Sequence, residues 1–294
     1  MRVNIVTEGI WIKRYWSDMI VKYNKTDKIN YTVSTSPTND ADVNFYICYN
    51  TYLPFQKSNI LDVAYVTHIH ANDTNAHARD IGRPFDKFRE MNAWIHQSKR
   101  SMEQFDKLGY PKDKNFLLTS AIVTNNFRPT IKIGIVQNGE VEGKGLHFMA
   151  DLVDKYDFTN FKFIICGKGW ELFTKKLEAK NIRYEVQTYN RYEYYENAQK
   201  ELYERMDYFL VPSLWEGGPV AVMEALASGR PIIAANVGYV PEFNVEYMFE
   251  AGNTNQLIDI FNKVQAPVME RVNKVANLDY TNYNEKLLEV LSKL

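Results

Sequence analysis

The chain has very little cysteine and no long apolar run. Its 294 residues include two cysteines, Cys48 and Cys166, and no Cys-x-x-Cys pair, which excludes a disulfide framework and a cysteine-based zinc site. No apolar stretch approaches the roughly 20 residues of a transmembrane helix. The N-terminus also lacks the tripartite pattern of a signal peptide. We therefore expect a soluble, cytoplasmic protein.

The sequence also lacks an excess of either charge. Lys and Arg number 35 against 36 Asp and Glu, which gives a formal net charge of −1. This balance provides no global attraction to nucleic acid, so we expect no nucleic-acid partner. Hydrophobic residues make up 45% and charged residues 24% of the chain, a composition that argues against extensive disorder. The length predicts two domains or one large one.

Strand-like and helix-like segments alternate in the first half of the chain. Strands are predicted at Val3–Val6, Tyr31–Ser34, Val43–Tyr49, Val63–Thr67, Trp94–His96 and Phe116–Leu118, and helices at Ile10–Tyr23 and Ser98–Leu108. The alternation is typical of parallel βαβ units and hence of a doubly wound sheet.

The same pattern starts again near Pro129. It predicts strands at Ile131–Val136, Phe161–Cys166, Arg183–Gln187, Tyr208–Val211 and Ile232–Ala235, and helices at Lys144–Lys155, Trp170–Ala179, Glu193–Arg205 and Pro219–Ala227. We predict an α/β protein with two Rossmann-like open parallel sheets facing across a cleft, in domains 1–128 and 129–280. An amphipathic helix at Tyr283–Leu294, within residues 281–294, is expected to pack back towards the first domain. Ligands of such folds bind outside the carboxyl ends of the strands.

The segment from Val211 to Pro231 carries the most chemical information. A buried strand enters a polar loop with Gly217 and Gly218, and Pro219 suits the start of the helix that follows. Gly229 fits a left-handed C-terminal cap. Backbone N–H groups at such a helix start bind anions, and the carboxylates of Glu216 and Glu224 can accept hydrogen bonds from sugar hydroxyls. The alternative interpretation is a capped helix with a solvated glutamate.

Glu216 and Glu224 stand in the pattern Pro-Ser-x-x-Glu-Gly-x-Pro-x-x-x-x-Glu-Ala-x-Ala-x-Gly-x-Pro. This run resembles the signature of GT-B retaining nucleotide-sugar glycosyltransferases, in particular glycosyltransferase family 4 (glycosyl transferases group 1). Flanking matches are Phe127-Arg128-Pro129, Lys144-Gly145, Val237-Gly238 and Pro241-Glu242. The resemblance covers roughly residues 127–255 and is thin over 1–126. It implies that residues 1–128 form the acceptor side and 129–280 bind the nucleotide sugar.

The resemblance implies a role for each matching residue. Glu224 would bind the ribose hydroxyls, and Lys144 would neutralise the diphosphate as a point charge. Glu216 would hold the donor sugar and the diphosphate, together with the Gly217–Val220 segment around Pro219. Gly167 would lie beside the nucleobase, as would the region near Gln187. Gly9, which is all that remains of a glycine-rich loop after the first strand, is a further candidate contact.

Two histidines and one substitution complete the predicted site. His68 and His70 follow the strand Val63–Thr67, and the family places a sugar-contacting histidine there; we prefer His68. The alternative is a metal site made by His68, His70 and Asp73. The metal-free chemistry of the family argues against it. The family carries an arginine before the Lys-Gly lysine, where this chain has Asn138, so half of the cationic clamp is missing. The other histidines, including His96, are interpreted as ordinary and partly exposed.

The resulting prediction is a metal-independent, retaining hexosyltransferase that needs no cofactor. It would move a hexose from a UDP- or GDP-linked donor to a hydroxyl of a sugar, glycan, lipid or protein acceptor. The missing arginine supports an alternative, a catalytically weak nucleotide-sugar-binding or partner protein; a sugar phosphorylase or epimerase is a rival within the enzymes. A basic cluster of Lys22, Lys25 and Lys28 near two tryptophans predicts either a solvated helix face, which is favoured, or peripheral membrane contact.

Overall fold

A computed structural model describes residues 1–9, 11–67, 87–189 and 199–294. The chain divides into two compact units. The first contains Met1–Asn126 together with Val275–Leu294, and the second contains Phe127–Lys274. The bounds therefore differ from the expected domains 1–128 and 129–280, because the segment from Val275 onwards belongs with the first unit.

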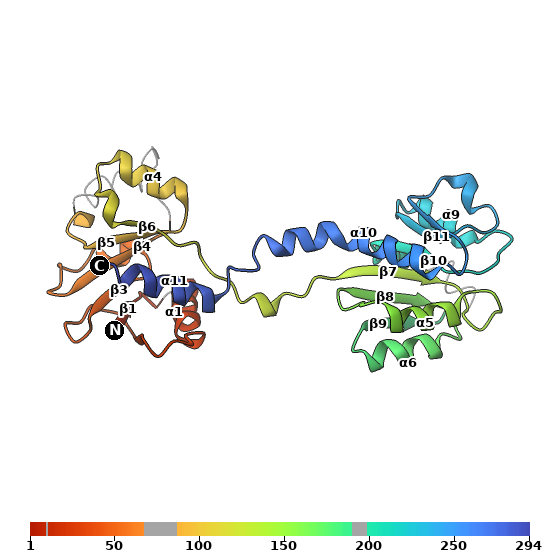
Figure 1. Cartoon of the computed structure of the whole chain (residues 1–294), viewed down its shortest axis with the longest axis horizontal. Coiled ribbons are helices and arrows are strands. Elements are labelled where there is room, and N and C mark those ends of the chain that lie inside the picture. Colours follow the sequence, from red (N-terminus) through yellow and green to blue (C-terminus); the bar gives the residue numbers. More distant parts are fainter. Residues whose placement is uncertain (10, 68–86, 190–198) are drawn as a thin grey trace. The chain divides into compact units, whose positions relative to one another are not determined.

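The first unit is built on a six-stranded parallel sheet with the order β2-β1-β3-β4-β5-β6 (Figure 1). Its strands are β1 (Arg2–Val6), β2 (Asn30–Ser34), β3 (Val43–Tyr46), β4 (Leu61–Val66), β5 (Ala93–His96) and β6 (Asn115–Leu117). Its helices are α1 (Trp11–Lys22), α4 (Lys99–Lys107) and α11 (Tyr280–Leu291), with short 3-10 turns η1 (Tyr49–Tyr52), η2 (Lys112–Lys114) and η3 (Thr124–Asn126).

Both faces of this sheet are buried. Along β4, Val63 and Tyr65 pack into a core with α1 and α11, whereas Ala64 and Val66 pack into a second core with α4. Because successive side chains of a strand point to opposite faces, a strand covered on both sides reads as a continuous apolar run. This explains why the segment Val63–Val66 of β4 reads as an apolar run in the sequence.

The C-terminal helix α11 is part of the first unit. Asn284 Nδ2 donates to the carbonyl of Ile20 in α1 at 2.9 Å, and Tyr31 donates its hydroxyl hydrogen to Asn284 Oδ1 at 2.8 Å. The helix begins at Tyr280, earlier than predicted, because Asp279 caps it by accepting from the N–H groups of Thr281 and Asn282 at 2.8 and 2.9 Å.

The second unit holds another six-stranded parallel sheet, with the order β12-β11-β10-β7-β8-β9. Its strands are β7 (Ile131–Val136), β8 (Phe161–Cys166), β9 (Arg183–Gln187), β10 (Tyr208–Val211), β11 (Ile232–Ala235) and β12 (Tyr247–Phe249). Its helices are α5 (Leu146–Lys155), α6 (Glu171–Ala179), α8 (Gln199–Glu204), α9 (Val220–Ala227) and α10 (Thr254–Asn273), with the 3-10 turn η5 (Val240–Phe243). The α/β fold with two open parallel sheets is thereby confirmed.

Several predicted bounds are corrected by local chemistry. Strand β3 ends at Tyr46 because the chain turns into η1, and α5 begins at Leu146 because Gly145 before it is left-handed. The elements β12 and α10 were not predicted. His96 is fully buried rather than partly exposed. Within the described ranges, no helix combines the length and apolar character needed to cross a bilayer.

Candidate functional site

The predicted site residues of the second unit lie around the point where its strand order reverses. From β7 the chain proceeds outward to β8 and β9 on one side, and β10 to β12 follow on the other. Ligands of doubly wound sheets bind at such a switch point, outside the carboxyl ends of the strands. Lys144 follows β7 and Glu216 follows β10, its hydrogen-bonded neighbour. The topology therefore brings the two loops together.

Lys144 is held between two glycines that dock on the loop after β10. Gly143 and Gly145 are both left-handed, with φ of +84° and +83°. A Cβ at Gly143 would lie 2.4 Å from the indole of Trp215, and one at Gly145 would lie 2.1 Å from the carbonyl oxygen of Pro212. Close approach of the two loops therefore requires glycine on both sides of the lysine.

Backbone and side-chain hydrogen bonds join the same two loops. Leu214 donates its N–H to the carbonyl of Gly143 at 2.6 Å. Gln137 Nε2 donates to the carbonyl of Lys144 at 2.6 Å, and Ser213 Oγ donates to Gln137 Oε1 at 3.3 Å. These contacts fix the backbone from which the ammonium of Lys144 extends.

The ammonium of Lys144 forms an ion pair with Glu216 Oε1. Both side chains are largely withdrawn from solvent, with exposed fractions of 23% and 10%. The second carboxylate oxygen, Glu216 Oε2, is buried and has no hydrogen-bond partner among the residues the structure describes. Because buried polar atoms are normally paired, this oxygen marks a position where a hydrogen-bond donor is missing.

Helix α9 begins at Val220 directly after this loop. Pro219 stands before it, and no side chain caps its first turn. The first N–H groups of such a helix and its positive dipole end are suited to an anion. Gly217 is exposed and a Cβ there would meet nothing within 4 Å, so the backbone is open to a ligand. The left-handed Gly229, with φ of +65°, ends the helix as predicted.

Glu224 lies on α9 and is oriented by a tyrosine from α8. Tyr203 is buried and donates its hydroxyl hydrogen to Glu224 Oε2 at 2.7 Å. Burial and the nearby carboxylate of Glu224 raise the pKa of the Cys166 thiol to about 11. Glu224 therefore interacts electrostatically with Cys166, the last residue of β8.

The loop that carries Asn138 and the loop that carries Gly167 contact each other. Asn138 Oδ1 accepts from the N–H of Lys168 at 2.9 Å, and Gly139 donates its N–H to the carbonyl of Lys168 at 2.7 Å. A Cβ at Gly167 would lie 2.1 Å from the carbonyl oxygen of Gln137. Asn138 thus holds the loop after β8 in place of supplying a positive charge.

The other predicted site residues are Gly9, His68 and His70. Gly9 belongs to the first unit, where it follows β1 and is left-handed with φ of +75°. His68 and His70 lie outside the described residues, as does Asp73. Within the described part of the chain, no group of three or more His, Cys, Asp or Glu side chains is arranged to hold a metal ion.

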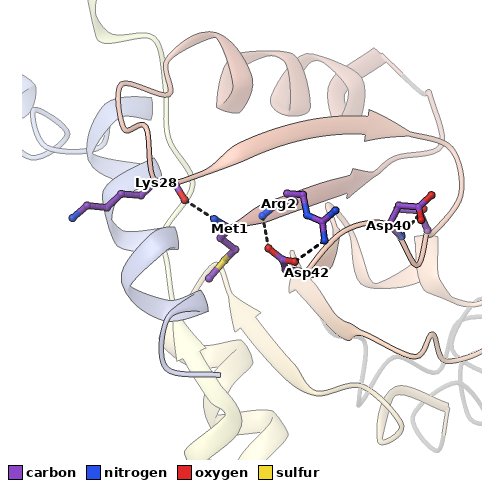
Figure 2. Close-up of polar contacts among 6 residues, drawn as sticks. Met1, Arg2, Lys28, Asp40 and Asp42 are labelled. Atoms are coloured by element: carbon purple, nitrogen blue, oxygen red, sulfur yellow. Dashed lines mark hydrogen bonds and ion pairs between the residues drawn. The ribbon is translucent and has the colours of Figure 1, made fainter.

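The sequence Asp40-Ala41-Asp42 has a structural role in the first unit. Arg2 donates to the Asp42 carboxylate from its backbone N–H at 2.7 Å and from Nη2 at 3.1 Å. Figure 2 shows both contacts. These hydrogen bonds, the backbone one foremost, lower the pKa of Asp42. Beside them the N-terminal ammonium of Met1 donates to the carbonyl of Lys28 at 2.9 Å. This acidic pair precedes β3, at the amino end of the strand.

The structure adds three residues that the sequence reasoning missed. Trp215 covers Gly143, Tyr203 orients Glu224, and Tyr239 packs its ring against Gly218. Trp215 and Tyr239 belong to motifs already singled out in the sequence. Each packs against a glycine, Gly143 and Gly218 respectively, and these glycines were the signal in the sequence that could have indicated the two contacts. Tyr203 had none, because nothing near it in the chain indicates that it contacts Glu224.

Comparison with known proteins gives a match to a family model over most of the second unit. Residues 127–266 match the model of "Glycosyl transferases group 1", which confirms the resemblance for a little under half of the chain. An uncharacterized glycosyltransferase of Methanocaldococcus jannaschii is 26% identical over 216 residues, covering 68% of this chain and 58% of that protein. Protein CapJ of Staphylococcus aureus is 26% identical over 141 residues, covering 45% and 35%.

A third relative, the D-inositol 3-phosphate glycosyltransferase of Corynebacterium efficiens, is 28% identical over 118 residues, covering 39% of this chain and 27% of that protein. The chain thus spans between 27% and 58% of the length of the curated relatives it matches. Among solved structures, it is similar to the lipopolysaccharide outer core galactosyltransferase WaaB at 13% identity and to HepE of Anabaena, in complex with UDP and glucose, at 12%. Both comparisons have a TM-score of 0.40 and cover 100% of each chain.

Proposed function

We propose that this protein is a retaining glycosyltransferase that moves a hexose from a nucleotide-diphosphate sugar to an acceptor hydroxyl. The observation that carries the proposal is the juxtaposition of Lys144 and Glu216 at the switch point of a doubly wound sheet. One group is a cation for a diphosphate, and the other is an acceptor for sugar hydroxyls. The match of residues 127–266 to glycosyl transferases group 1 supports the same chemistry.

Each residue of the group has a chemical task in this proposal. Lys144 and the first N–H groups of α9 stabilise the negative charge that develops on the departing diphosphate, as preorganised charges do in other transferases. Glu216 holds the sugar, and Glu224, oriented by Tyr203, accepts hydrogen bonds from the ribose. Gly167, Asn138 and Gln187 line the approach of the nucleobase. Retention rests on the resemblance to family 4, as does the role given to His68.

The proposed reaction needs no divalent metal. Charge neutralisation is assigned to Lys144 and helix amides, and Asp40-Ala41-Asp42 stands at the amino end of β3 with Asp42 bound to Arg2. We expect full turnover in the presence of a chelator and unchanged turnover in Asp42→Asn. If a chelator abolished turnover and manganese restored it, this assignment would be wrong. His68, His70 and Asp73 would then be the candidate metal ligands.

A second candidate function is a nucleotide-sugar-binding protein with weak or no turnover. The observation that favours it is Asn138, which bonds to the loop after β8 where the family resemblance calls for a clamp arginine. The missing charge lowers the stabilisation available to a departing diphosphate. An enzyme with Lys144 alone is therefore expected to be slower than one with both cations.

One assay series separates the two functions. A thermal-unfolding screen against UDP, GDP and other nucleoside diphosphates identifies the base, because a ligand that binds the native state raises the unfolding temperature. Nucleotide sugars carrying that base are then incubated with sugar, glycan and lipid-linked acceptors, and release of the diphosphate is measured. Turnover establishes the transferase; tight binding without turnover, with and without acceptor, establishes the binding protein.

A further inference from the structure

The buried side-chain atoms of the second unit that lack partners among the described residues include two of opposite hydrogen-bonding character on neighbouring loops. The first is the hydroxyl oxygen of Tyr239 and the second is Glu216 Oε2; neither has a hydrogen-bond partner among the described residues. A phenol donates a hydrogen, whereas an ionised carboxylate only accepts. Unpaired buried groups of this kind are rare in native proteins because each loses its hydrogen bonds to water.

The tyrosine is held directly against the loop that carries Glu216. Tyr239 follows β11 and immediately precedes η5. A Cβ at Gly218 would lie 1.9 Å from the Tyr239 ring, and one at Gly238 would lie 2.5 Å from the carbonyl oxygen of Gly217. The ring also meets that of Phe243 edge to face, with centroids 5.6 Å apart. Both loops therefore lie in close contact, and the ring has little freedom to turn away.

The surroundings keep the hydroxyl of Tyr239 protonated. Burial raises the pKa of Tyr239, and the negative charges of Glu216 and Glu224 raise it further. At neutral pH this residue is therefore a hydrogen-bond donor and not a phenolate.

We infer that Tyr239 is a further binding residue for the donor, and that its hydroxyl donates to an oxygen of the sugar unit while Glu216 Oε2 accepts from a hydroxyl of the same sugar. The inference rests on the proposed function. A sugar ring carries neighbouring hydroxyls that both donate and accept, so it satisfies the two atoms at once. A diphosphate oxygen accepts only, so it would pair with Tyr239, leave Glu216 Oε2 without a donor, and be repelled by the carboxylate.

The closing experiment compares Tyr239→Phe with the wild type, using UDP, UDP-glucose, GDP and GDP-mannose as probes in isothermal titration. We expect the affinity for the diphosphates to stay within about twofold, and the affinity for the matching nucleotide sugar to fall about threefold to tenfold, the range for one neutral hydrogen bond. Tyr247→Phe is the matched control, because Tyr247 begins β12 and its ring lies 6.2 Å from that of Tyr208 at the amino edge of the sheet.

Stability gives a second readout that does not depend on ligand. The hydroxyl of Tyr239 has no hydrogen-bond partner among the described residues, so Tyr239→Phe should leave the unfolding temperature unchanged or raise it. A lower unfolding temperature would mean that the hydroxyl is already bonded and would overturn the inference. A double variant with Glu216→Gln should lose less affinity for the nucleotide sugar than the two single losses combined, because both groups bind one sugar.

Failure of the inference about Tyr239 and failure of the proposed function give different results in these experiments. Equal losses of affinity for the diphosphate and the nucleotide sugar would place Tyr239 at the diphosphate and overturn the assignment to the sugar. Unchanged affinity for both would remove Tyr239 from the site while leaving the proposed function intact. A wild-type protein that binds none of the four probes, nor any other nucleotide sugar, would remove the proposed function and the inference together.

Discussion

Lys144 and Glu216, which are 72 residues apart in the chain, form an ion pair at the carboxyl edge of the second sheet. The proposed function assigns the first to the diphosphate and the second to the sugar. In the unliganded chain the two groups therefore neutralise each other. A bound diphosphate has to compete with the carboxylate for the lysine, and once it does, Glu216 becomes available to the sugar.

This competition predicts opposite effects of the two neutral variants on diphosphate binding. Lys144→Gln should weaken the affinity for the nucleoside diphosphate about tenfold, because it removes the cation. Glu216→Gln should strengthen that affinity about threefold, because it removes both the competing partner and a repulsive charge. Both should lower turnover: Lys144→Gln by about 100-fold, because a preorganised charge is lost, and Glu216→Gln because the sugar is held less well.

Isothermal titration with the diphosphate and initial-rate measurements check these effects. Lys155→Gln is the control for Lys144→Gln, since Lys155 is an exposed lysine at the last residue of α5. Diphosphate affinity that falls in Glu216→Gln as much as in Lys144→Gln would show that the ion pair does not compete with the ligand.

Glu224 provides a prediction about the ribose. The wild type should bind the nucleoside diphosphate more tightly than its 2′-deoxy analogue, and Glu224→Ala should bind both about equally, with roughly tenfold weaker affinity for the ribose form. Tyr203→Phe should show an intermediate preference, because Tyr203 holds the Glu224 carboxylate through a hydrogen bond of 2.7 Å. Competition binding with the two nucleotides measures the preference. A wild type indifferent to the 2′-hydroxyl, and equally to a 3′-deoxy analogue, would remove Glu224 from the ribose.

The glycine before Lys144 predicts a separation of stability from activity. Gly143→Ala and Gly229→Ala both place alanine at positive φ, at +84° and +65°, which costs about 1–2 kcal/mol of stability. Only Gly143→Ala also drives a methyl group into the indole of Trp215, whereas the space at Gly229 is open. We expect turnover to fall at least tenfold in Gly143→Ala and to change little in Gly229→Ala.

Thermal unfolding and initial rates of the two variants make this comparison. Because Trp215 is 55% exposed, its removal is tolerable, and Gly143→Ala combined with Trp215→Ala should recover part of the unfolding temperature lost in Gly143→Ala. If Gly229→Ala loses as much turnover as Gly143→Ala, backbone strain alone explains the effect and the indole contact does not position Lys144.

His96 predicts a pH dependence of stability in the first unit. Burial lowers the pKa of His96, whose ring nitrogens lie 3.0 Å from Ser101 Oγ and 3.0 Å from Asn115 Oδ1. The folded state therefore favours the neutral ring, and its contribution is fully present above the unfolded pKa of about 6.5. Below that pH the unfolded chain binds the proton more readily, so the free energy of unfolding falls as the pH drops towards the lowered folded pKa.

Urea unfolding of the wild type and of His96→Asn from pH 8 to pH 5 tests the sign. The wild type should be more stable at pH 8, and the difference between the two should shrink as the pH falls. His147→Asn is the control, because His147 is exposed on α5. A stability difference that stays constant over this pH range would mean that the His96 ring titrates alike in both states.

The sequence by itself determined the features that depend on residues close together in the chain. Strands such as β10 and β11 are continuous apolar runs because both faces of the sheets are covered. The end of α9 at the left-handed Gly229 follows from local backbone preference. The motif around Glu216 and Glu224 indicated the chemistry. In contrast, α10 was not predicted, because it contains Pro267, a residue that normally interrupts a helix.

Only the tertiary structure decided which of these residues meet. The pairing of Lys144 with Glu216 depends on β7 and β10 being neighbours in the sheet, and strand order is a property of the whole fold. The same holds for Tyr203 at Glu224, for Tyr239 at Gly218, and for the burial of His96. Local pattern reports whether a side chain suits a strand, helix or loop, because those preferences arise within a few residues. Contacts between distant loops arise only when the packed sheets bring them within hydrogen-bonding distance, and no local preference encodes that distance.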